Sequence, residues 1–157
     1  MKKYFITLFI VLFLFTGLSY SADKSFDMYI GANILTDSSF TFEYYLWGPG
    51  VAFDFYLTDN LTISPEAYMY VYKFEFNPFI LAPAVLVNMR FNTFFVGAGI
   101  TKWFLIGSNA SDVSSDFALK INAGFVSESL KLSFFAITSF DELFSDMALG
   151  ASLAFRF

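Results

Sequence analysis

Seven charged residues within alternating segments of the chain are the groups best placed to do chemistry. They are three acids and four bases: Asp27, Asp54, Glu66, Arg90, Lys120, Lys131 and Arg156. If these side chains share one narrow interior, they can pair with one another and close it as a polar plug. The alternative is that the same residues line a gated or selective pore. We expect the plug, because seven aromatic side chains are predicted to fill the same space: Tyr29, Tyr56, Tyr68, Tyr70, Tyr72, Phe95 and Phe135.

Catalytic and metal-binding groups are scarce. The 157 residues include no His and no Cys, the commonest ligands of zinc, haem, copper and iron–sulfur centres, so we expect no cofactor. Ser111-Asp112 and Ser115-Asp116 have no His to act as a general base near neutral pH. We therefore predict that the protein is not an enzyme.

Acidic residues crowd the segments between the alternating stretches. They are Glu43, Glu75, Asp112, Asp116, Asp141, Glu142 and Asp146. We expect a solvated acidic rim, and the alternative is a surface that binds basic partners, or divalent cations that bridge to anionic lipid headgroups. The spacing of a calcium-binding loop is not present.

Composition restricts the class of protein. The chain is 57% apolar and 22% aromatic but only 15% charged, with a net charge of −5. Disordered chains have low hydrophobicity, and nucleic-acid-binding domains usually carry a basic patch, so both classes are disfavoured. An apolar, cysteine-free chain of this length fits a single domain whose strands close on themselves.

Alternation of apolar and polar residues predicts eight β-strands of about ten residues each. Their ranges are Phe26–Leu35, Val51–Leu57, Leu61–Lys73, Phe79–Met89, Thr93–Phe104, Phe117–Val126, Leu130–Ser139 and Met147–Phe157. Tight connections at 58–60, 90–92 and 127–129 alternate with longer ones at 36–50, 74–78, 105–116 and 140–146. This is the layout of a closed, antiparallel, up-and-down transmembrane β-barrel. Phe40–Trp47 also alternates, and it either forms a separate strand or extends its neighbours.

One face of the predicted strands is apolar and the other is polar. Met69 and Val71 illustrate the apolar face, on which Lys102 is the only charge. Glycines share the face with the seven charged residues, as expected in a crowded small-barrel interior: Gly31, Gly97, Gly99, Gly124 and Gly150. Aromatic residues gather at both strand ends, Trp103 among them, as in the two belts at membrane interfaces. We therefore expect the apolar face to meet lipid, the alternative being a soluble barrel with that face inside.

Two prolines conflict with this arrangement. Pro65 and Pro83 lie within predicted strands, where each removes a ladder hydrogen bond. We expect a β-bulge at each.

The N-terminus has the three-part layout of a secretory signal peptide. Met1-Lys2-Lys3 precedes an apolar run over 4–15, and small or polar residues follow. The run is short for a membrane span of about 20 residues. We predict cleavage after Ser21, which leaves a barrel domain of residues 22–157.

The C-terminal strand resembles the assembly signal of bacterial outer-membrane β-barrels. The match consists of Gly150, Leu153, Phe155 and the terminal Phe157, while Ala148 stands where that pattern usually has a polar residue. With Leu57-Thr58-Asp59-Asn60-Leu61, the layout resembles the small outer-membrane barrels of the OmpA-transmembrane-domain and OmpX type. The resemblance implies residence in the bacterial outer membrane, with its lipid and the barrel-assembly machinery as partners, and we expect a monomer.

The predicted function is an integral outer-membrane β-barrel with a structural or surface-interaction role through its loops at 36–50 and 105–116. The alternatives are a narrow channel for small solutes and a soluble exported barrel that binds an apolar ligand. The sequence identifies no extracellular partner.

Overall fold

The computed structural model describes residues 26–37, 45–107, 113–141 and 147–157. The predicted signal peptide, residues 1–21, lies outside the described residues. No helix in the described residues is long and apolar enough to cross a membrane.

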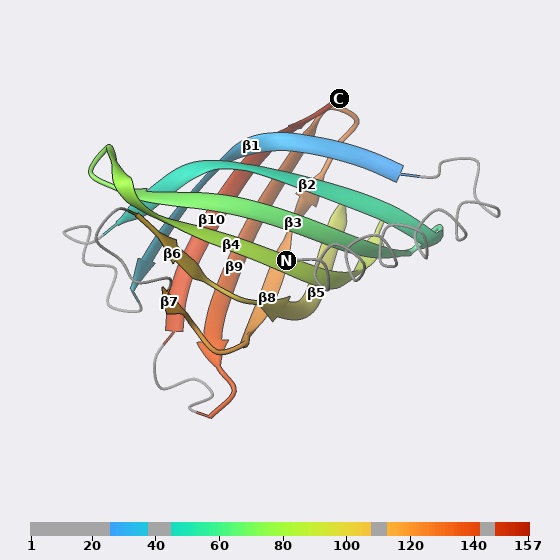
Figure 1. Ribbon diagram of the computed structural model, residues 1–157. Helices are drawn as coiled ribbons and strands as arrows, with labels where there is room; N and C mark the ends of the chain where they lie inside the picture. Colours follow the sequence, from blue (N-terminus) through green and yellow to red (C-terminus); the bar gives the residue numbers. More distant parts are fainter. Residues whose placement is uncertain (1–25, 38–44, 108–112, 142–146) are drawn as a thin grey trace, which may run out of the picture.

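Ten β-strands form one sheet (Figure 1). They are β1 (Phe26–Asp37), β2 (Leu46–Thr58), β3 (Leu61–Tyr72), β4 (Glu75–Phe91), β5 (Phe94–Thr101), β6 (Phe104–Ile106), β7 (Val113–Ser114), β8 (Ala118–Val126), β9 (Leu130–Ser139) and β10 (Met147–Arg156). All pairings are antiparallel, and β1 pairs with both β2 and β10, so the sheet closes on itself.

The ten strands occupy eight strand positions around the barrel, and we call each position a stave. β5 and β6 both pair with β4 and follow each other around a short interruption, so they form one stave. β7 pairs with β6 and β8 pairs with β5, which makes β7 and β8 the next stave. The predicted fold class, a closed eight-stranded antiparallel barrel, is confirmed.

Three of the predicted long connections are shorter in the structure. In the connection 105–116, residues 105–106 belong to β6 and 113–114 form β7. Residues 46–50, assigned to the connection 36–50, form the first part of β2. The predicted long connection at 74–78 is also wrong. Lys73 and Phe74 form a two-residue turn with φ of 44° and 66°, and β4 already begins at Glu75. Two positive φ values in succession match the right-handed twist of paired strands, which explains why so short a turn can join them.

Neither proline produces the expected bulge. The register between β3 and β4 is the same on both sides of Pro65 and Pro83. Pro83 faces the interruption between β5 and β6, where its missing N–H has no ladder partner to lose. Its carbonyl oxygen is still used, because it accepts hydrogen bonds from the backbone N of Lys102 at 3.1 Å and from Thr101 Oγ1 at 3.0 Å.

The polar face of the strands points inward and the apolar face points outward. Asp54 and Asn88 are each 2% exposed, whereas Val85 is 45% and Met89 49% exposed. Val71 and Thr138 are exceptions, because both are buried although alternation places them outside. At Val71 a register irregularity between Tyr70 and Tyr72 interrupts the alternation.

Aromatic rings pack against glycines on neighbouring strands inside the barrel. Gly50 pairs with Tyr68, and Gly150 pairs with Phe135. A Cβ atom added at either glycine would meet the partner's ring. The missing side chain lets the ring lie close to the backbone of the next strand, which fills a narrow interior without displacing the sheet.

Candidate functional site

The interior holds three ion pairs in its polar half, and an apolar layer follows toward the long-loop end. The first ion pair lies nearest the short-turn end of the barrel and joins the first and last strands. Arg156 of β10 pairs with Asp27 of β1, and the Tyr56 hydroxyl donates a hydrogen bond to Asp27 Oδ2 at 2.5 Å. Arg90 donates to the same Tyr56 hydroxyl and lies over its ring. Arg156 thus contacts Asp27 directly, whereas Arg90 is linked to Asp27 through the Tyr56 hydroxyl.

The second pairing crosses the lumen from β2 to β9. Lys131 Nζ donates to both carboxylate oxygens of Asp54, at 2.6 and 2.8 Å. The Ser64 hydroxyl donates to Asp54 Oδ1 at 2.6 Å, and Asn88 Nδ2 donates to Ser64 at 2.6 Å. The ammonium group also lies about 5 Å from the ring centroid of Tyr29. Asp54 therefore accepts three hydrogen bonds, two from Lys131 and one from Ser64, which offset much of the cost of burying its charge.

The third pairing lies nearer the loop end and joins β3 to β8. Lys120 Nζ donates to Glu66, and both side chains are almost completely buried. The same ammonium group lies 4.1 Å from the centroid of the Phe135 ring and 4.9 Å from that of Tyr68. The aromatic rings thus surround a charge that water does not reach.

All seven predicted lumen residues lie on the inner face, and each predicted acid contacts at least one of the predicted bases. The pattern of residue types did not reveal Ser64 and Asn88, which extend the hydrogen bonding around Asp54. The sequence could have indicated them as lumen residues, since both lie at inward positions of the predicted alternation.

Beyond the third pairing the interior becomes apolar. Buried residues of four strands, β1, β3, β4 and β9, pack together there: Leu35, Tyr68, Tyr70, Ala82, Phe135 and Ile137. Trp103 packs against this layer, with its ring centroid 6.5 Å from that of Tyr70. Its assignment to the outer aromatic belt is therefore wrong. Because Lys102 faces outward, alternation places the next residue, Trp103, inside. The prediction was wrong because it relied on the position of Trp103 near the strand end.

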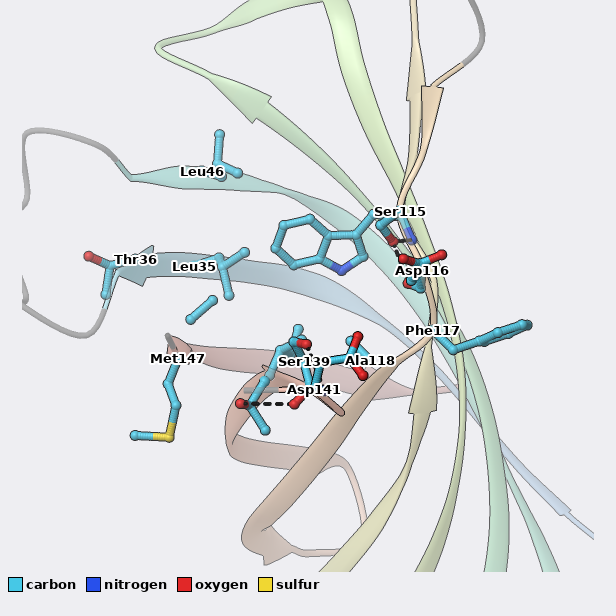
Figure 2. A pocket seen from close by; sticks show the side chains of 14 residues that line it. Leu35, Thr36, Leu46, Ser115, Asp116, Phe117, Ala118, Ser139, Asp141 and Met147 are labelled. Atoms are coloured by element: carbon cyan, nitrogen blue, oxygen red, sulfur yellow. Dashed lines mark hydrogen bonds between the residues drawn. The ribbon is translucent and has the colours of Figure 1, made fainter. Parts of the chain in front are cut away.

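A cavity of about 580 Å³ lies above the apolar layer at the long-loop end, and we call it the mouth cavity. Its lining includes Leu35, Trp103 and Ile137, and Asp116 and Asp141 contribute carboxylates. Figure 2 shows Leu35 and Leu46 on one side of the space, with Asp116 on another, while the Phe117 side chain points away.

The remaining predicted groups are partly outside the described residues. Ser111-Asp112, Glu43, Glu142 and Asp146 are not described. Ser115 Oγ accepts a hydrogen bond from the backbone N of Trp103 at 2.9 Å and donates to the carbonyl of Asp116 at 2.7 Å, so it serves the backbone. In the described ranges no three His, Cys, Asp or Glu side chains gather as metal ligands would.

The predicted assembly-signal residues occupy both faces of β10. Gly150 faces inward against Phe135, whereas Leu153, Phe155 and Phe157 are exposed on the outside. The backbone N of Phe157 donates to the carbonyl of Met28 at 3.0 Å, which ties the chain end to β1.

Comparisons with known proteins bear on the fold. No family model matches the chain, and no curated protein matches it by sequence. The structure is similar to the N-terminal β-barrel domain of Pseudomonas aeruginosa OprF, with 14% identity, 83% of this chain and 97% of that chain covered, and a TM-score of 0.50. Ail, the attachment invasion locus protein of Yersinia pestis, matches at 13% identity over 84% of this chain and 97% of that one, with a TM-score of 0.46; its structure contains the heparin analogue sucrose octasulfate. The predicted resemblance to the small outer-membrane barrels is confirmed at the level of fold: the chain folds as a small, closed, eight-stranded β-barrel.

Proposed function

We propose that the chain is an integral outer-membrane β-barrel with its apolar face in lipid and its lumen closed by side chains. The observation that carries this proposal is the reversal of the usual distribution, with charged residues such as Asp54 and Lys120 buried inside and large apolar residues exposed on the outer face of β1, β4, β5, β8 and β10. Large exposed apolar patches on a protein mark surfaces that contact a membrane or a partner. The aromatic residues at the turn end support the same view. Phe26 packs near Phe55 and Phe94 near Phe125, with centroids 6.0 and 5.6 Å apart, where a membrane interface selects such rings.

The role that follows is structural, or interaction through the long loops. The three ion pairs and the apolar layer occupy the lumen of a barrel whose eight strands leave room only for side chains. A catalytic role is not proposed, because a His general base is missing from the whole sequence. We propose a monomer that contacts outer-membrane lipid and the assembly machinery, after cleavage of residues 1–21.

Fractionation and heat modifiability test the membrane assignment. The full chain should be recovered in the outer-membrane fraction of a double-membraned bacterium. The folded protein should migrate differently in SDS before and after boiling. Recovery in the periplasm or medium would refute the assignment.

Planar bilayers test closure of the lumen and separate it from the channel alternative. Purified wild type should give no steady conductance. A Glu66→Ala/Lys120→Ala variant, which removes the pair between the polar and apolar halves, should conduct more than wild type. Large single-channel conductance by the wild type would refute a closed lumen and support the channel alternative.

A further inference from the structure

The mouth cavity combines an apolar floor with two acidic residues in its lining. Leu35 and Ile137 are buried in the apolar layer and also line the cavity, so its floor is a fixed surface. The volume of about 580 Å³ is within the range of about 300–1,000 Å³ that small-molecule sites occupy. A ligand with an apolar body would replace water against this floor.

Charge at the cavity is of one sign. The lining residues include the carboxylates of Asp116 and Asp141 and no Lys or Arg. The neighbouring cation, Lys102, lies against the rings of Phe104 and Phe117 at 5.6 and 5.2 Å from their centroids. Phe117 points away from the cavity, which keeps that lysine on the outer side (Figure 2). The field inside the cavity therefore favours a cation.

One polar atom in the wall, Trp103 Nε1, is buried and has no partner among the described residues. A ligand that offers this N–H an acceptor gains affinity, because an unpaired buried polar group is costly. The Trp103 ring also presents an aromatic face suited to an ammonium group.

We propose that the mouth cavity binds a small amphipathic organic cation, with its ammonium group at Asp116 and Asp141 and its apolar body against Trp103 and the floor. This goes beyond the structural role proposed above, and it does not depend on residence in a membrane.

Binding is tested with three probes of one size and different charge: phenethylammonium, 2-phenylethanol and phenylacetate. The protein is the full barrel, refolded in non-ionic micelles and carrying Trp47→Phe. Because the sequence has two tryptophans, Trp103 is then the only fluorophore of its kind, and it reports on the cavity directly. Trp47 packs on Phe74 and does not line the cavity. We expect phenethylammonium to bind about fivefold tighter than the alcohol, as two exposed charge contacts predict, and phenylacetate to bind weakest.

Two variants separate charge from shape. Asp116→Asn/Asp141→Asn should bring the affinity ratio of ammonium to alcohol close to one, while Asp59→Asn, the same change at the opposite end of the barrel, should preserve it. Ala148→Phe fills the cavity and should abolish binding of all three probes, with folding confirmed by circular dichroism. Equal binding of the three probes, no binding by any of them, or an unchanged preference in the double Asn variant would overturn the proposal.

Discussion

Replacing Lys131 with Met tests whether the lumen pairs stabilise the barrel. Methionine keeps much of the lysine's length and its contact with the rings but removes the ammonium group. Asp54, 2% exposed, then loses two of its three hydrogen bonds and keeps only the one from Ser64. Removing one partner of a buried ion pair costs about 3–5 kcal/mol. Because Ser64 still donates, we expect the lower part of that range, about 3–4 kcal/mol of unfolding free energy.

Urea unfolding of the refolded barrel in micelles measures the effect, with tryptophan fluorescence as the signal. Lys102→Met is the matched control, since it makes the same chemical change on the outer face, and we expect it to alter stability by less than about 1 kcal/mol. Asp54→Asn/Lys131→Met removes both charges and should recover at least half of the loss.

Two results would refute this reasoning. A loss below about 1 kcal/mol in Lys131→Met would mean that water or another group solvates Asp54 in the folded barrel. A double variant as unstable as the single one would mean that the lost stability comes from packing and not from an uncompensated charge.

Three further predictions concern other parts of the barrel. Gly150→Ala should lower the unfolding free energy by about 1–3 kcal/mol because its Cβ meets the Phe135 ring, whereas Ala151→Val on the outer face should change it little; urea titration compares the two. Tyr56→Phe should cost about 1–2 kcal/mol in the same assay, since its hydroxyl links an arginine to a carboxylate, and an unchanged midpoint would contradict that link. Phe157→Ser should reduce the amount of barrel in the outer membrane of cells while leaving refolding in micelles nearly intact, and equal cellular levels would count against the assembly signal.

The strands and their faces were predictable because alternation is a local property. A period of two residues places side chains on opposite faces whatever the partner strand is. Where the local pattern is broken, prediction failed. Gly48, Pro49 and Gly50 have turn-like composition, yet they belong to β2, with Gly50 required by the ring of Tyr68.

The partners inside the lumen were not predictable residue by residue. Asp54 meets Lys131 although 77 residues separate them and their strands are not neighbours in the sheet. Which side chains meet across a barrel depends on the stagger of all eight staves, and sequence spacing does not contain that stagger. The tight turn at Lys73-Phe74 was not predicted for a different reason: neither Lys nor Phe is a residue type that commonly adopts positive φ.

Closure through β1 and β10 has a consequence for the order of folding. These two strands are the first and the last of the barrel in sequence, so their pairing has the largest loop to close and is the costliest contact to form early. Until β10 is in place, β1 and β9 present unpaired backbone edges that can join other chains. Any truncation that removes β10 therefore leaves the other strands with two open edges, and the expected product is an aggregate rather than a smaller barrel.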